Sequence, residues 1–366
     1  MKINFFDALA LADVERVHSQ VIAWIFHPEN PTFNIDEKTL LLSRLFGLSR
    51  IPKYSHIDVS TEEQHIDILV IAEGVAGNDI YVIENKLKSS QHSNQLERYK
   101  NFINTYTSNS KSNVNNKYFG YLTLLNEDAC ADSWININYR NLRDGLKTIT
   151  NGKKPTISGE YILKEYIESL DTMLLVLQDF LTHPNNYQNV FDEGSSTKFK
   201  KKGIKRSTSF SEYQRYIMQN QLETPLQKLF LSNIASKIDY SYKHMIGETR
   251  GNAYLQYHFT PAIQVNNCTM QYGVQFQGKS IKFNLSAIDY NNSKSDVIDD
   301  EIISNFNSYI DKLGYKKLNI GKRKAYISIS KSLQKNIWEY SIDELSEIYR
   351  NELKKAADLI SKTTLK

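Results

Sequence analysis

Two acidic residues and one lysine lie at the ends of two neighbouring apolar segments. Asp67 stands between Ile66 and Ile68, and Glu84 and Lys86 close the segment VIENK. A buried apolar segment ordinarily excludes unpaired charge, so charged side chains at its end need a partner. Glu84 and Lys86 are two positions apart and share one face of a strand. If the two segments pair as strands, Asp67 can approach Glu84, and two neighbouring carboxylates repel each other unless a cation lies between them.

The cation that suits such a pair is a hard, oxygen-preferring divalent ion such as Mg²⁺, for which Mn²⁺ can substitute. A metal held by Asp67 and Glu84 polarises a phosphodiester oxygen and lowers the pKa of a water molecule. Lys86, on the same face, can orient that water or stabilise the charge that develops on the phosphate. The three residues therefore indicate in-line hydrolysis. An ordinary salt bridge at a strand end accounts equally well for the residue types alone.

Helices and strands must position these residues. Apolar residues at spacings of three and four predict a helix over residues 7–26, stopped by Pro28, and a second helix over 36–46, closed by Gly47. Strands are predicted at 57–63, 65–72 and 80–87, and turn residues between them favour an antiparallel meander. A helix over 91–106, with its N-cap at Ser89 or Ser90, precedes a strand at 118–125. The expected order is helix, three strands, helix, strand.

This pattern resembles a known family. Asp67 followed by Glu84-Asn85-Lys86 is similar to the D…(D/E)-x-K signature of the PD-(D/E)XK nucleases, and the expected order of elements is similar to their shared core. No proline precedes Asp67, a departure that is common in the superfamily. The resemblance implies an α/β, restriction-endonuclease-like fold and a metal-dependent nuclease with Asp67, Glu84 and Lys86 in its active site.

A second resemblance lies in the predicted helix after the lysine. Gln95-Leu96-Glu97-Arg98-Tyr99 is similar to the Q-x-x-x-Y element of one branch of these nucleases. Gln95 and Tyr99 are four residues apart and point the same way from a helix. The resemblance implies that both face the active site and position substrate or Lys86. A core-facing tyrosine beside an incidental glutamine is the alternative.

The first predicted helix carries the third resemblance. ERVHSQVIAWIFHP is similar to the E-x-x-H-S-x-x-L-x-W-L-x-x-P opening of a bacterial branch of uncharacterised PD-(D/E)XK proteins. The resemblance implies that Glu15 completes the metal site, and a solvated helix charge is the alternative. His18 is expected to be structural rather than a ligand. The bacterial branch suggests antiviral defence against foreign DNA.

Later elements divide the chain. A strand is expected at 134–139, and helices at 140–149 and 160–181. We expect a nuclease domain over residues 1–185, a basic linker over 186–210 and a C-terminal α+β module over 211–366. In that module, helices are expected at 211–238, 299–313 and 342–360, and strands at 254–259, 270–276, 280–288 and 324–329. The sequence of the module indicates no chemistry.

The linker holds the densest basic run, KFKKKGIKR, whose basic residues are Lys198, Lys200, Lys201, Lys202, Lys205 and Arg206. Such a run could grip a phosphate backbone, and a solvated linker is the alternative. DNA is the expected partner. RNA cleavage, or nucleic-acid binding without catalysis on the same fold, are the alternative functions, and oligomerisation is open.

Composition sets the remaining bounds. The 366 residues are 40% hydrophobic and 23% charged, which supports folded domains rather than global disorder. The net charge of +4 permits a nucleic-acid partner without arguing for one. Cys130 and Cys268 lie far apart in the sequence, so we do not expect a structural zinc site. The low cysteine content favours a reducing compartment. With no signal-peptide pattern and no long apolar run, a cytoplasmic protein without membrane contact is expected.

Overall fold

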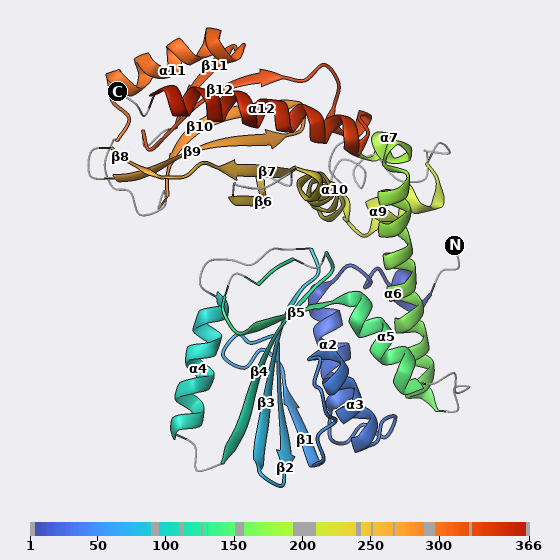
Figure 1. Cartoon of the computed structure of the whole chain (residues 1–366). Coiled ribbons are helices and arrows are strands. Elements are labelled where there is room, and N and C mark those ends of the chain that lie inside the picture. The colour runs from blue at the N-terminus through green and yellow to red at the C-terminus, as the bar shows by residue number, and fades with distance from the viewer. Residues whose placement is uncertain are drawn as a thin grey trace. The chain divides into compact units, whose positions relative to one another are not determined.

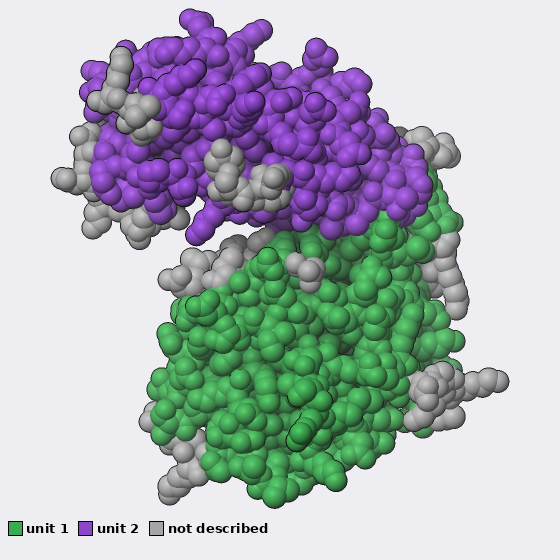
Figure 2. Space-filling model, in the orientation of Figure 1, with its two compact units in different colours: residues 1–178, 209–222 green, residues 179–208, 223–366 purple. Residues whose placement is uncertain are grey.

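The computed structural model of the chain describes residues 4–88, 95–109, 113–125, 127–129, 131–150, 157–192, 210–238, 243–249, 252–265, 268–288, 297–321 and 324–363. It forms two compact units (Figure 2). Unit 1 comprises residues 1–178 and 209–222, and unit 2 comprises 179–208 and 223–366. These bounds differ from the sequence-based division, because residues 211–222 pack with unit 1 and residues 179–185 with unit 2.

A five-stranded mixed sheet, in the order β1-β2-β3-β4-β5, is the centre of unit 1. The first three strands form the expected antiparallel meander, and β4 and β5 add in parallel. A two-residue turn joins β2 to β3, and Gly77, which closes it, has a φ of +127° that other residues rarely adopt. The strands are β1 (Tyr54–Ser60), β2 (Ile68–Gly74), β3 (Gly77–Lys86), β4 (Val114–Thr123) and β5 (Trp134–Asn138).

Helices cover both faces of this sheet (Figure 1). On one face lies α4 (Gln95–Asn109), and on the other lie α2 (Glu15–Phe26), α3 (Ile35–Leu45) and α5 (Tyr139–Thr150). The long helix α6 (Ser158–Thr182) follows α5, and Pro184 opens a short 3-10 turn (Pro184–Tyr187) after it. Leu96 of α4 packs in the core with Leu69 of β2 and Val82 of β3. The predicted order of helix, three strands, helix, strand is confirmed, and residues 89–94 lie outside the described part of the chain.

Two predicted helices are wrong in their extent. The segment 7–26 spans the second half of α1 (Phe5–Ala8) and all of α2, and the two helices are separated because Ala10 has a positive φ of 54°, outside the range of a right-handed α-helix. The segment 211–238 contains α9 (Glu212–Gln219) and α10 (Glu223–Lys237), and Gln221 between them has a φ of 53°. The helices on both sides of each break bury apolar residues at helical spacing. The apolar periodicity therefore continues through the break, and the sequence pattern predicts one long helix.

Unit 2 is built on a second sheet, whose described strand pairs are all antiparallel, in the order β11-β12-β10-β9-β7-β6, with β8 paired to β9. Strands β6, β8 and β11 were not predicted from the sequence. The strands are β6 (Lys243–Thr249), β7 (Asn252–His258), β8 (Ile263–Val265), β9 (Cys268–Gln277), β10 (Ser280–Ala287), β11 (Lys317–Ile320) and β12 (Tyr326–Ser332). The helices are α7 (Gln188–Asp192), α10, α11 (Asp300–Leu313) and α12 (Ile342–Thr363). Among the residues with a described placement, no helix is both long and apolar enough to cross a membrane.

Candidate functional site

The site lies where β2 begins and β3 ends. The last pair of their antiparallel ladder is Ile68 with Ile83, so one step further in the same register Asp67 lies opposite Glu84. Asp67 is half-buried, whereas Glu84 is fully buried. The backbone N–H of Asn85 donates to Asp67 Oδ2 at 2.8 Å, which fixes the Asp67 carboxylate against the end of β3.

Lys86 and the first turn of α2 complete the charged cluster. Lys86 Nζ lies 2.5 Å from Glu84 Oε1 and 3.8 Å from Glu15 Oε1. The second oxygen of Glu15 accepts a hydrogen bond from the backbone N–H of Leu87 at 2.8 Å. Glu15, predicted to reach the site from the first helix, therefore does so.

Burial and like charge dominate the electrostatics. Burial, reinforced by the Asp67 carboxylate, raises the pKa of Glu84 to about 8, although Lys86 opposes the shift. Burial also raises the pKa of Asp67, against the hydrogen bond from Asn85 and the charge of Lys86. Burial lowers the pKa of Lys86, but the adjacent carboxylates, Glu84 foremost, raise it by more, so the net shift of the Lys86 pKa is upward. The cluster thus places three carboxyl groups beside one lysine, and the raised pKa values of Glu84 and Asp67 mean that their negative charge is unfavourable there without a further cation.

Helix α4 brings an amide to the same cluster. Gln95 Nε2 donates to Glu84 Oε1 at 2.8 Å and to Tyr99 Oη at 2.7 Å, and Tyr99 Oη donates to the carbonyl of His65 at 2.5 Å. Gln95 and Tyr99 therefore share one helix face, as predicted. Gln95 contacts the buried carboxylate directly, whereas Tyr99 fastens α4 to the segment before Asp67.

Asn85, between the two charged residues of β3, points to the opposite layer. Its Nδ2 donates to the carbonyl of Glu15 and to Ser19 Oγ, both at 3.0 Å, and its Oδ1 accepts from Tyr139 Oη at 2.7 Å. All three side-chain hydrogen bonds of Asn85 are made to residues in the N-terminal parts of α2 and α5. Sequence reasoning did not assign Asn85 a role. The signal available in the sequence was an amide residue within an apolar strand. Its hydrogen-bond partners could not be read from the sequence, because they are 54 to 70 residues away.

His18 belongs to the core rather than to the charged cluster. Its Nε2 lies 3.0 Å from the carbonyl of Ala12, and its Nδ1 lies 2.9 Å from Tyr166 Oη. Because a carbonyl can only accept, Nε2 carries the proton and Nδ1 accepts from the tyrosine. Burial lowers the pKa of His18 to about 4, so the imidazole is neutral at pH 7. These contacts agree with a structural role.

The cluster fits a divalent cation. Glu84 Oε2 is buried and has no hydrogen-bond partner among the described atoms, so one hard oxygen is left for another ligand. The described residues contain no group of three or more His, Cys, Asp or Glu side chains with the geometry of a metal centre. Mg²⁺, however, is commonly held by one or two carboxylates, with water and substrate phosphate as its other ligands. Asp67 and Glu84 would supply the carboxylates.

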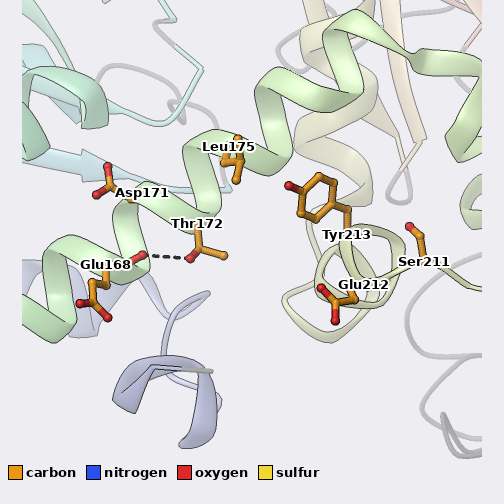
Figure 3. A pocket seen from close by; sticks show the side chains of 7 residues that line it. All are labelled: Glu168, Asp171, Thr172, Leu175, Ser211, Glu212 and Tyr213. Carbon is orange, nitrogen blue, oxygen red and sulfur yellow. Dashed lines mark hydrogen bonds between the residues drawn. The ribbon is translucent and has the colours of Figure 1, made fainter. Parts of the chain in front are cut away.

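A pocket of about 650 Å³ opens elsewhere in unit 1, between α6 and α9 (Figure 3). Asp171 and Leu175 line it from α6, and Tyr213 from α9. The Asp171 carboxylate already accepts from Arg143 at 2.8 Å and from Lys147 at 2.9 Å. None of the candidate catalytic residues lines this pocket.

One group of predicted site residues lies outside the described part of the chain. It is the basic run of Lys198, Lys200, Lys201, Lys202, Lys205 and Arg206. Its role in nucleic-acid binding stays a prediction.

Comparison with known proteins gives one match. Residues 3–179 match the model of the PD-(D/E)XK nuclease superfamily, a range that includes every member of the charged cluster and Gln95. No curated protein and no solved structure matches the chain.

Proposed function

Residues 3–179 belong to the PD-(D/E)XK nuclease superfamily, and we propose that this chain is a Mg²⁺-dependent nuclease that hydrolyses DNA phosphodiester bonds. The observation that carries the proposal is the meeting of Asp67, Glu84 and Lys86 at one strand end, where the buried Oε2 of Glu84 has no hydrogen-bond partner among the described atoms. Mn²⁺ can replace Mg²⁺ in such an oxygen site.

Each residue has a role that its contacts support. Asp67 and Glu84 would hold the cation, and Glu15, anchored by the N–H of Leu87, would extend the negative site from α2. A cation bound there supplies a Lewis acid that polarises a phosphodiester oxygen. Lys86 would orient the attacking water and stabilise the charge that develops on the phosphate.

The amide of Gln95 holds Glu84 Oε1 in place, and this contact leaves Oε2 for the cation. Tyr99 in turn holds Gln95 and the backbone of His65. We therefore assign Gln95 and Tyr99 to positioning of the carboxylate. A buried carboxylate held by two partners keeps the geometry that transition-state stabilisation requires.

We also propose a place for the reaction. The first helix resembles a bacterial branch of the superfamily, and cleavage of foreign DNA in antiviral defence would suit such an enzyme. This step rests on resemblance rather than on the geometry of the site.

The test is cleavage of plasmid, linear duplex and RNA of matched length, with Mg²⁺, Mn²⁺ or EDTA. We expect DNA cleavage with either metal and none with EDTA, and loss of cleavage in Asp67→Asn, Glu84→Gln and Lys86→Met. Glu73→Gln, an exposed carboxylate on β2, is the matched control and should cleave normally. Normal cleavage by folded Glu84→Gln would overturn the site, and cleavage of RNA alone would correct the substrate.

A second measurement separates metal binding from turnover. A ligand that binds only the folded protein stabilises it by RT ln(1 + [L]/Kd). Mn²⁺ should therefore raise the melting temperature of the wild type and of Glu73→Gln, but not of Asp67→Asn or Glu84→Gln. Equal shifts in all four proteins would place the cation elsewhere.

A further inference from the structure

The sheet of unit 2 has two chemically different faces. Helices cover one of them: Phe276 stacks on Tyr349 of α12 with ring centroids 3.5 Å apart, and Phe283 stacks on Phe306 of α11. Successive strand residues point to opposite faces. The residues that alternate with Phe276 and Phe283 therefore form the other face, and Figure 1 shows α11 and α12 on the covered side.

This second face, which we call the amide face, is polar across its central strands. The register places Gln256 opposite Gln275, Gln275 opposite Lys282, and Lys282 opposite Ser330. Asn284 lies opposite Ser328 in the same way. The described strands of unit 2 contain one acidic residue, Glu248, which pairs with Ala253 on the covered face. These strands therefore place no Asp or Glu on the amide face.

The amide face combines partly exposed residues, Gln275, Lys282 and Ser330, with buried polar ones, Gln256, Asn284 and Ser328, and one of the buried ones has an unused donor. Asn284 is 1% exposed, and its Oδ1 accepts from Gln256 Nε2 at 3.2 Å, yet its Nδ2 has no partner among the described atoms. Gly273 lies opposite Asn284, and a Cβ at Gly273 would come within 2.5 Å of Gln256 Nε2. A glycine there leaves room for the two amides to lie across the strand.

Positive charge accompanies these donors. Lys282 Nζ lies 3.1 Å from Gln275 Oε1, which holds the ammonium group on the face. Lys317, exposed on β11, lies opposite Ser330 on the same face. A cationic, donor-rich surface whose described strand residues include no carboxylate complements a polyanion, whereas an apolar partner would bury its amides without hydrogen bonds.

We propose that the amide face binds the phosphodiester backbone of the nucleic acid that unit 1 cleaves. The inference rests on the proposed function for the identity of the polyanion. Side-chain amides, hydroxyls and lysines are the groups that contact phosphates in protein–nucleic-acid complexes, and such contacts carry no base information. Unit 2 would therefore supply affinity that does not depend on sequence.

The test is fluorescence anisotropy of a labelled duplex with the full chain in EDTA, over a series of salt concentrations. In Lys282→Gln/Lys317→Gln, affinity should fall and the slope of log affinity against log salt should decrease by about 1.8, because each phosphate that a lysine neutralises contributes about 0.9. Lys312→Gln/Lys354→Gln makes the same charge change on exposed positions of α11 and α12. This control should keep the wild-type slope.

A matched pair tests the sign of the charge. Ser330→Glu should weaken binding by roughly tenfold, because the new carboxylate repels phosphate. Ser330→Gln introduces a side chain of the same size as glutamate but without its charge, and it should bind like the wild type. Circular dichroism checks that both fold. Equal affinities for the pair, or an unchanged slope in Lys282→Gln/Lys317→Gln, would overturn the inference. If these binding variants still cleave duplex, the proposed function stands whatever becomes of the amide face. If the wild type binds duplex but never cleaves it, the proposed function is overturned and the inference on the amide face is not.

Discussion

Replacing His18 should change how the stability of unit 1 depends on pH. Burial lowers the pKa of His18 from 6.5 to about 4, while the nearby charges of Asp13 and Lys88 act in opposite directions. The folded state therefore binds fewer protons than the unfolded state between these values. The contribution of the neutral imidazole is fully present above pH 6.5 and is lost as pH falls towards 4.

The size of the effect follows from the shift. One pKa unit corresponds to about 1.4 kcal/mol, so the full shift corresponds to roughly 3 kcal/mol, of which about 2 kcal/mol is lost between pH 7.5 and pH 5. His18→Asn removes the titrating group. We expect the variant to be the less stable protein at pH 7.5 and its deficit to shrink by about 2 kcal/mol at pH 5.

Urea unfolding with pulsed hydrogen exchange suits this measurement, because a peptide from α2 reports unit 1 and a peptide from α12 serves as an internal reference. Burial raises the pKa of Asp7 to about 6, which stabilises the fold as pH falls, but Asp7 is present in both proteins and its effect cancels. The exposed His56 provides the control variant His56→Asn. A deficit of His18→Asn that is the same at both pH values would refute the reasoning.

Two further predictions concern the support and the reach of the site. Tyr139→Phe leaves the buried Oδ1 of Asn85 without its donor and should lower the free energy of unfolding by about 1–3 kcal/mol, measured by urea unfolding against the exposed control Tyr161→Phe. Replacing the basic residues 200–202 by alanine should weaken DNA binding for all sequences alike and reduce the salt slope by about 0.9 for each phosphate that is no longer neutralised. An unchanged slope would identify that run as a solvated linker.

The sequence was sufficient to predict the core of unit 1 because its signals are local. Strands β2 and β3 are indicated by their Ile and Val residues, and the glycine-rich turn between them fixes which residues pair. Once that pairing is known, Asp67 must approach Glu84. The helix spacing of Gln95 and Tyr99 likewise places them on one side of α4.

Other features depend on contacts that no local pattern contains. The break at Ala10 is a backbone conformation that apolar periodicity cannot report. Strand β6 has an exposed pattern without clear alternation, so only its pairing with β7 makes it a strand. The role of Asn85 depends on Ser19 and Tyr139, which are distant in sequence. Tertiary contacts decide such positions, and a single sequence gives no measure of them.

The alternation along β3 separates the proposed catalytic residues of the E-N-K segment from its structural residue. Glu84 contacts Gln95 of α4, and Lys86 pairs with Glu84 on the same side of the strand, whereas Asn85 faces α2 and α5. A slip of one residue between β2 and β3 would exchange these faces and put an amide where the carboxylate must be. The three side-chain hydrogen bonds of Asn85 oppose that slip, because a lysine in the same buried position has no acceptor for the Tyr139 hydroxyl proton and a glutamate has no donor for the Glu15 carbonyl. Asn85, between the two charged residues, thus helps to hold β3 in the register that places Glu84 opposite Asp67, on which the proposed metal site depends.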